Sequence, residues 1–292
     1  MTDQQWLAER FEEHRSRLRA VAYRMLGSLS EADDAVQDAW LRVSSADASE
    51  VENLGAWLTT IVARVALNML RSRNTRREQP LGVHVPDPVV DPADGTDPEH
   101  EALLADSVGL ALLVVLETLS PAERLAFVLH DMFAVPFEQI APIVERSPEA
   151  TRQLASRARR RVRGSAPVPN ASLTEQWNVV DAFLAAARKG DFEALVALLD
   201  PDVVLRADGG MTGLSRQVQG AEAVASQASM WARAGLTIRR ALVNGAAGLV
   251  SERQGKPFSV GAFTIKDGKI VECDFLVDPD RLAQLDLEVL QD

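Results

Sequence analysis

Several residue types are scarce in this sequence, and each absence narrows the possible classes of protein. A single cysteine, Cys273, excludes an intramolecular disulfide and indicates a reducing, cytoplasmic environment. The four histidines lie far apart without the spacing of metal ligands, so we expect no metal and no cofactor. The longest apolar run, residues 108–116, is much shorter than the ~20 residues of a membrane span. We therefore expect no membrane partner, and the acidic N-terminus does not resemble a signal peptide.

Lysine is absent before Lys189, so arginine carries the positive charge of most of the chain. The formal net charge is −11, yet arginines gather in residues 64–77 and 146–163. Between them, residues 78–123 contain ten acids and neither Lys nor Arg. The arginine side chain suits bidentate contacts to phosphate groups and base edges. The segregation of charge suggests local anion-binding surfaces, although a coding bias toward arginine would give the same composition.

Helical periodicity and a proline-rich segment divide the first half of the chain. Apolar residues keep helical spacing through residues 1–78, which predicts an all-α domain. Residues 79–98 contain five prolines and two glycines among alternating acids, so we expect an acidic linker that cannot form a packed core. Helical spacing resumes in residues 99–166, which predicts a second all-α domain.

The end of this second domain has the pattern of a helix-turn-helix. A short helix is expected to break near Glu145, and Ser147 and Pro148 start the next one. At about 100° per residue, one face of that helix carries small and apolar residues, and the arginines avoid it. A coding bias would scatter arginines around the helix, so a recognition helix and a merely solvated basic face are the interpretations that remain.

Residues 167–292 differ in character from the rest of the chain. A helix pair is expected in residues 176–199, and five strand-like segments follow, with an Asp-Gly hairpin turn between the last two. Helices followed by a curved antiparallel sheet predict an α+β cone. This part has neither histidine nor tyrosine, which leaves Asp208 or Asp274 as a lone base. We therefore expect the protein not to be an enzyme.

Three stretches of the helical half resemble a known family of transcription factors. FEQIAPIVERSPEATRQLASRARRRV, from residue 137, is similar to region 4 of extracytoplasmic-function (ECF) sigma factors. YRMLGSLSEADDAVQDAWLRV and AWLTTIVARVALNMLRSR, from residues 23 and 56, resemble region 2 of the same family. The resemblance implies that residues 1–78 and 99–166 are regions 2 and 4. It also implies that the RNA polymerase core and promoter DNA are the partners.

The resemblance implies roles for individual residues as well. The surface of region 2 that docks the clamp helices of the largest polymerase subunit would include Asp34, Gln37, Asp38 and Trp40. For Trp40, a place in the helical core is an equally good interpretation. The −10 promoter element would face Arg64, Asn68 and Arg71. The −35 element would face Arg152, Gln153, Ser156, Arg157 and Arg160.

The C-terminal part resembles a second family. VVDAFLAAARKGDFEALVALLDPDVVLRADGG, from residue 179, is similar to the opening of SnoaL-like domains, and sigma factors with this extension form a subgroup. The resemblance implies that residues 167–292 regulate the sigma domains through an intramolecular contact with those domains or with the linker. Candidate regulatory contacts are Asp208, Gly209, Gly210, Asp278, Pro279, Asp280, Arg281 and Leu282.

The leading hypothesis is a sigma factor whose activity is modulated by its own C-terminal domain. Two alternatives remain at this point. One is a ligand-responsive helix-turn-helix regulator, and the other is a SnoaL-like cyclase or isomerase with a regulatory helical part.

Overall fold

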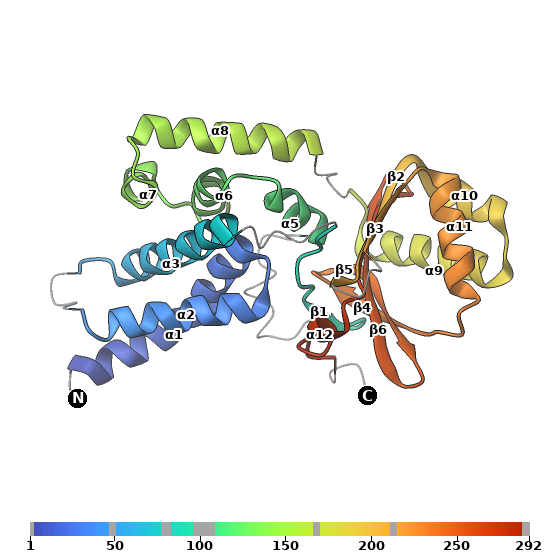
Figure 1. Ribbon diagram of the computed structural model, residues 1–292, viewed down its shortest axis with the longest axis horizontal. Coiled ribbons are helices and arrows are strands. Elements are labelled where there is room, and N and C mark those ends of the chain that lie inside the picture. The colour runs from blue at the N-terminus through green and yellow to red at the C-terminus, as the bar shows by residue number, and fades with distance from the viewer. Residues whose placement is uncertain are drawn as a thin grey trace. The chain divides into compact units, whose positions relative to one another are not determined.

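The computed structural model (Figure 1) describes residues 3–46, 51–76, 83–95, 109–165, 170–210 and 215–287. The chain forms two compact units. The helical unit comprises Met1–Gln79, Glu101–Asp106 and Val115–Ser165, and the sheet unit comprises Pro80–His100, Ser107–Val114 and Ala166–Asp292. No helix within the described ranges has the length and apolar character needed to cross a membrane.

Three long helices form the first half of the helical unit: α1 (Asp3–Leu26), α2 (Leu29–Val43) and α3 (Leu54–Arg76). Gly27, at φ +71°, follows α1, and the Ser28 hydroxyl accepts a hydrogen bond from the Glu31 amide at the start of α2. The helices pack their apolar faces together. Large side chains that are at most 1% exposed there include Leu18, Met25, Leu26, Leu58 and Leu67.

Further helices and one π-helical turn form the second half. They are α5 (Leu110–Glu117), whose first residues belong to the sheet unit, α6 (Pro121–Phe127), the π-helical turn η1 (Val128–Met132), α7 (Phe137–Val144) and α8 (Pro148–Ser165). α6 starts with a capping box, in which Ser120 and Glu123 each accept a hydrogen bond from the other's amide. Glu145, at φ +56°, caps α7 and turns the chain into α8, so α7 and α8 form the helix-turn-helix.

A seven-stranded sheet is the framework of the sheet unit, with the order β1-β4-β5-β6-β7-β2-β3. Its strands are β1 (Val90–Pro92), β2 (Leu199–Asp208), β3 (Arg216–Gln219), β4 (Thr237–Val243), β5 (Ala246–Arg253), β6 (Lys256–Lys266) and β7 (Lys269–Leu276). β2 and β7 pair in parallel, and the other described pairs are antiparallel.

Helices cover one face of this sheet (Figure 1). α9 (Leu173–Lys189), α10 (Phe192–Leu198) and α11 (Ala221–Ala232) share a buried core with the strands. Phe183 of α9, Val224 of α11 and Phe263 of β6 belong to it. The short α12 (Pro279–Leu282) follows β7.

The described part of the linker packs on the sheet unit. In its described part, residues 83–95, Val85, Val89 and Val90 are at most 3% exposed. β1 pairs with β4, and Val89 exchanges hydrogen bonds with Asn244. The segment cannot build a core of its own, but it docks on one, and an edge strand tolerates its prolines because only one side of it needs hydrogen bonds.

Candidate nucleic-acid interface and linker clasp

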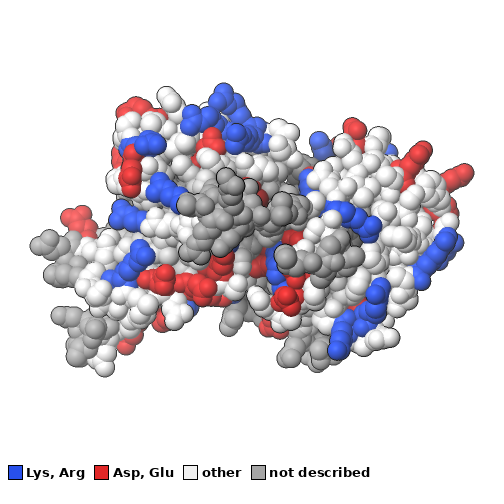
Figure 2. All heavy atoms as spheres, viewed as in Figure 1, with Lys and Arg blue, Asp and Glu red and all other residues white. Residues whose placement is uncertain are grey.

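The spacing of α8 places its arginines as the sequence predicts. Thr151, Ala155 and Ala158 are fully buried and Leu154 is nearly so. The predicted contact residues are all exposed: Arg152, Gln153, Ser156, Arg157 and Arg160. Figure 2 shows Lys and Arg side chains gathered over this helix. The exposed face of α8 is therefore a basic surface on a helix-turn-helix, a geometry that suits the major groove of DNA.

Several α8 arginines also contact carboxylates of the helical unit. Arg152 Nη2 lies 2.7 Å from Glu138 Oε1, and its guanidinium lies 5.5 Å from the centre of the Phe137 ring. Arg159 Nε lies 2.6 Å from Asp131 Oδ1. These pairs are partly exposed to solvent, so they contribute little to stability and leave the arginines able to exchange partners.

Arg157 has a second role in the fold. Its Nε lies 3.1 Å from Glu123 Oε1, and Arg161 Nη1 lies 3.2 Å from the other oxygen of that carboxylate. Burial alone would raise the pKa of Glu123, but the hydrogen bonds from Ser120 and Arg157 and the charge of Arg161 outweigh it and lower the pKa. Arg157 thus helps to keep the capping residue of α6 ionised, a contact that the sequence did not indicate.

A second basic stripe runs along α3. Arg64, Asn68 and Arg71 are exposed and follow one another at intervals of four and three residues, so they share one side of the helix. The opposite side is buried, with Val62 and Ala66 fully inaccessible. The two predicted DNA-facing sets therefore lie on separate helices, each with its polar side in solvent.

α2 presents a different, mainly acidic face. Asp34, Gln37 and Asp38 are exposed, whereas Trp40 is half-buried with its ring 5.1 Å from that of Phe11. Leu41 lies on the same side of α2 as Asp34 and Asp38 and is 61% exposed, although it is a large apolar residue. Leu41 is not among the residues predicted from the sequence to form this face. The helical spacing contained the signal, because the buried positions Ala35, Val36, Ala39 and Val43 leave Leu41 outside the core.

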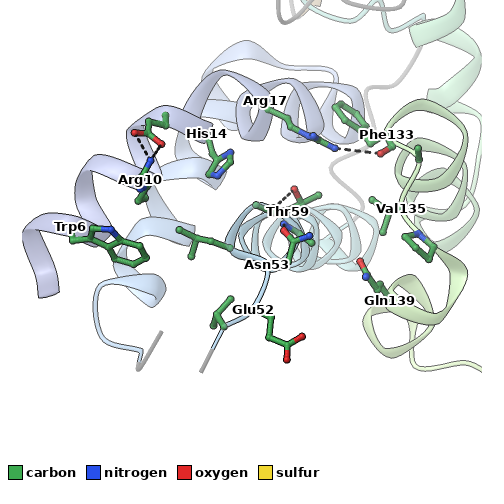
Figure 3. Close-up of a pocket in the computed structure, with 17 residues that line it drawn as sticks. Trp6, Arg10, His14, Arg17, Glu52, Asn53, Thr59, Phe133, Val135 and Gln139 are labelled. Atoms are coloured by element: carbon green, nitrogen blue, oxygen red, sulfur yellow. Dashed lines mark hydrogen bonds and ion pairs between the residues drawn. The ribbon is translucent and has the colours of Figure 1, made fainter. Parts of the chain in front are cut away.

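The two halves of the helical unit are linked through arginines and through Phe133. A pocket of about 840 Å³ lies between α1, the start of α3 and the segment before α7, and Trp6, His14, Asn53 and Gln139 are among its lining residues (Figure 3). Beside it, Arg17 Nη2 donates to the Phe133 carbonyl oxygen at 3.4 Å. The Arg24 guanidinium lies 4.7 Å from the centre of the Phe133 ring. None of the predicted site residues is among the described residues that line this pocket.

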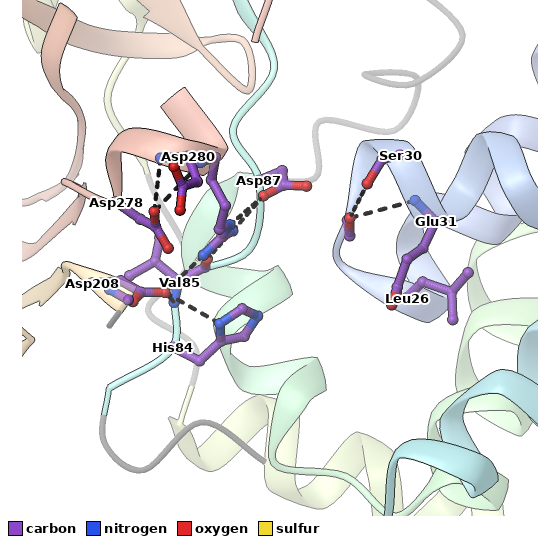
Figure 4. A network of polar contacts seen from close by, with 12 residues as sticks. Leu26, Ser30, Glu31, His84, Val85, Asp87, Asp208, Asp278 and Asp280 are labelled. Carbon is purple, nitrogen blue, oxygen red and sulfur yellow. Dashed lines mark hydrogen bonds and ion pairs between the residues drawn. The ribbon is translucent and has the colours of Figure 1, made fainter. Parts of the chain in front are cut away.

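The predicted regulatory residues meet the linker in the sheet unit (Figure 4). Arg281 makes contacts with both segments. Its Nε lies 2.7 Å from Asp87 Oδ1, and its Nη2 lies 2.6 Å from the Val85 carbonyl oxygen. Its Nη1 lies 2.8 Å from Asp208 Oδ2. The same Asp208 oxygen accepts from the Val85 amide at 3.0 Å and lies 3.2 Å from His84 Nδ1. We call these five residues, His84, Val85, Asp87, Asp208 and Arg281, the linker clasp.

The electrostatics of the clasp favour the ionised form of Asp208. Burial would raise the pKa of this carboxyl, whereas the hydrogen bonds from His84, the Val85 amide and the Gly210 amide, together with the charge of Arg281, lower it to about 2. Asp208 is therefore a carboxylate held ionised by the donors that face it. It is poorly suited to act as a base.

The other predicted residues of this group shape the backbone around the clasp. The Asp278 carboxylate caps α12 by accepting from the amides of Asp280 and Arg281, and Pro279 occupies the first turn. Gly210 has φ +54°, and a Cβ at this position would lie 1.9 Å from the Asp278 carboxylate, so only glycine fits. Leu282 is 3% exposed and anchors the short helix. Gly209 donates its amide to Ser215 Oγ at 3.1 Å.

The second candidate base, Asp274, lies in a different ionic cluster. Arg206 bridges Asp274 and Glu272 at 2.9 Å each. Burial raises the pKa of Asp274 to about 6, with Arg206 opposing and Glu272 adding to the shift. Within the described residues, no group of three or more histidine, cysteine or carboxylate side chains is arranged to hold a metal ion.

The architecture is that of an ECF sigma factor with a C-terminal extension. It consists of two helical modules, the second of which ends in a helix-turn-helix with a basic face, and an appended cone domain. Sigma-70 region 2 matches residues 10–76, sigma-70 region 4 matches residues 109–162, and a SnoaL-like domain matches residues 180–273. The chain belongs to the ECF RNA polymerase sigma factors, and it is a transcription initiation factor rather than an enzyme. The predicted family and fold class are confirmed.

Named relatives support this assignment over nearly the whole chain. The chain is 39% identical to the ECF RNA polymerase sigma factor SigJ of Mycobacterium tuberculosis H37Rv, over 94% of this chain and 92% of that protein. It is 33% identical to the probable ECF sigma factor SigI of the same species, over 94% of each. The crystal structure of M. tuberculosis SigJ superposes with a TM-score of 0.75 and 35% identity, covering 96% of this chain and 99% of that one.

Proposed function

We propose that this protein directs core RNA polymerase in the cytoplasm to one class of promoters, and that its C-terminal domain modulates this activity through the linker. In this proposal the exposed face of α8 contacts the −35 element, and Arg64, Asn68 and Arg71 of α3 contact the −10 element. The acidic face of α2, with Leu41 as an added apolar anchor, docks on the clamp helices of the largest polymerase subunit.

The distribution of charge supports a division of labour between the protein and polymerase. Affinity for DNA rises steeply with the number of phosphates that a protein neutralises. A chain of net charge −11 with two small basic surfaces neutralises few of them. The polymerase then contributes most of the affinity, and the sigma factor contributes the choice of promoter.

The linker clasp carries the regulatory part of the proposal. The linker connects the two segments that read the promoter, and Arg281 joins it to Asp208 through Asp87 and the Val85 carbonyl. While the clasp holds the linker on the sheet unit, the linker cannot adopt a different conformation. Release of the clasp therefore changes the conformations available to regions 2 and 4, which shifts the population that is competent for initiation.

Run-off transcription with added core polymerase tests both parts. The full chain is compared with a truncation after Gly164 and with Arg281→Ala, and Arg233→Ala, an exposed arginine of the same unit, is the matched control. We expect Arg281→Ala to change the yield several-fold in the same direction as the truncation, while Arg233→Ala behaves as the full chain.

Two outcomes would contradict the proposal, and they are distinguishable. Equal yields from all four proteins would exclude regulation by the C-terminal domain but leave initiation standing. No promoter-specific transcript with core polymerase, combined with tight specific binding to duplex DNA by the chain alone, would favour a helix-turn-helix regulator instead.

A further inference from the structure

Arg152 of α8 contacts an aromatic ring as well as a carboxylate. Its guanidinium lies over the Phe137 ring, 5.5 Å from the ring centre, while its Nη2 donates to Glu138 Oε1 at 2.7 Å. Among the described arginines of α8, Arg152 is the one with such an aromatic contact. Phe137 and Glu138 are the first two residues of α7. The start of the first helix of the helix-turn-helix therefore holds an arginine of the second.

The Phe137 ring is held in turn by His130. The two ring centres lie 3.8 Å apart with an angle of 25° between the ring planes, so the rings are stacked. His130 Nδ1 lies 3.0 Å from the Val135 carbonyl oxygen. Because a carbonyl oxygen only accepts, this hydrogen bond requires a proton on Nδ1, and it fixes the orientation of the imidazole. Stacking then restricts the plane of the Phe137 ring, which is only partly buried.

The backbone between these two rings has an unusual conformation. The π-helical turn η1 contains His130, and the Val135 amide donates to the Leu129 carbonyl oxygen at 2.9 Å. Ala134 has φ +55°, which is unfavourable for a residue with a Cβ. Single π-helical turns and strained residues of this kind are frequent at functional sites. Here they allow the two rings to stack directly before the helix-turn-helix.

Arg152 lies where a recognition helix reads bases. The N-terminal residues of the second helix of a helix-turn-helix contact base edges, and Arg152 lies in the N-terminal half of α8. The commonest specific contact of an arginine is bidentate, to O6 and N7 of guanine. Both donors reach these atoms only when the guanidinium lies close to the plane of the base pair. The orientation of Arg152 therefore affects the reading of a base more than the overall affinity for DNA.

We infer that Phe137, oriented by His130, is a positioning residue for Arg152 and increases the discrimination of the protein for a guanine in the −35 element. The ring keeps the guanidinium ordered when Glu138 is exchanged for DNA, so less conformational entropy is lost when the base is bound. The effect on discrimination rests on the proposed function, because it requires that α8 reads the −35 element. The order of the Arg152 side chain does not depend on that function.

The order of the Arg152 side chain is measured by NMR relaxation of its Nε–Hε group in the full chain. We expect the order parameter to fall by at least about 0.2 in Phe137→Leu, on a scale where ~0.85 is rigid and below ~0.6 is flexible. Phe137→Tyr retains the aromatic face and should retain the order. Equal order in Phe137→Leu and the unsubstituted protein would overturn the inference, because the ring would then not hold the guanidinium.

Discrimination is measured by run-off transcription with core polymerase from promoters in which each base pair of the −35 element is replaced in turn. Loss of an exposed cation–π contact in Phe137→Leu should lower the preference for guanine at a single position by about two- to fivefold. Phe137→Tyr should restore that preference. Phe133→Leu removes an aromatic contact to Arg17 and Arg24 instead, so it is the matched control and should leave the preference unchanged.

A double-mutant cycle separates positioning from a general structural effect. In an Arg152→Ala background, Phe137→Leu should cause no further loss of preference, because its effect acts through Arg152. A further loss of the same size, or a loss spread equally over all positions of the −35 element, would overturn the inference. If thermal melting shows that Phe137→Leu does not fold, His130→Ala and His130→Phe make the same comparison, since only the second retains a stacked ring.

Failure of the proposed function has a different signature. An unsubstituted protein that shows no preference for any −35 sequence would contradict the proposed function. The NMR comparison of Phe137→Leu with Phe137→Tyr would still decide whether the ring positions Arg152.

Discussion

Arg152 of α8 and Arg281 of α12 both contact carboxylates, but their surroundings differ. The Arg152 side chain is 49% exposed and its partner Glu138 is 62% exposed. The Arg281 side chain is 20% exposed, and its partner Asp208 is 3% exposed. Exposed ion pairs contribute ~0–1 kcal/mol, whereas removal of one partner of a buried pair costs about 3–5 kcal/mol.

The difference separates two uses of one residue type. Arg152 can leave Glu138 for a phosphate at little cost, which suits a surface that binds and releases DNA. Arg281 joins three acceptors from two distant segments, and a fixed fork of donors is well suited to that task. Exposure and partner number, rather than charge, distinguish an exchangeable contact from a structural one.

The largest expected effect is the loss of stability of the linker clasp when Arg281 is substituted. Arg281→Ala removes the cation that faces Asp208 and leaves the Asp87 carboxylate without its arginine. Because Arg281 is not fully buried, we expect a loss near the lower end of the buried-pair range, about 3 kcal/mol. That loss corresponds to roughly a hundredfold faster hydrogen exchange of the Val85 and Val89 amides, measured by mass spectrometry. Unchanged exchange relative to Arg233→Ala would show that the clasp does not hold the linker.

Smaller effects are expected from substitution of two arginines of α8, Arg157 and Arg160, and these effects differ in kind. Arg157→Ala and Arg160→Ala should each weaken −35-dependent initiation by ~1–3 kcal/mol, measured as the ratio of transcript from an intact and an altered −35 element. Only Arg157→Ala should also destabilise the helical unit, by about 1 kcal/mol, because it removes a partner of the buried Glu123. Equal thermal stability of both variants would show that the Glu123 contact is not structural.

The same comparison shows which parts of the fold and of the candidate sites can be predicted from the sequence. The exposed face of α8 was predictable because helical geometry alone decides which residues share a side, and Thr151, Ala155 and Ala158 are buried as expected. The capping and turn residues likewise act within a few positions of one another. Local rules therefore predict the elements and the basic surfaces well.

The docking of the linker could not be predicted in the same way. The pairing of Asp87 with Arg281 spans 194 residues, and the register of β1 on β4 depends on a core that lies elsewhere in the chain. Proline content indicates that residues 79–98 lack a core of their own, but it carries no information on a docking site. Similarly, the role of Arg157 as a partner of Glu123 arises from tertiary packing between α6 and α8.

The smallest expected effect comes from substitution of Glu138, the exposed partner of Arg152. Glu138→Gln removes the carboxylate that competes with DNA for Arg152, while the side chain keeps its size. Since exposed pairs are weak, stability should change by less than about 0.5 kcal/mol, and −35-dependent initiation should rise by at most about fivefold. Thermal melting and the same transcription ratio measure the two quantities, with Glu149→Gln, whose carboxylate lies 3.8 Å from Arg152, as the matched control. A loss of stability of several kcal/mol in Glu138→Gln would mean that Arg152 is held as firmly as Arg281, and the distinction between the two arginines would fail.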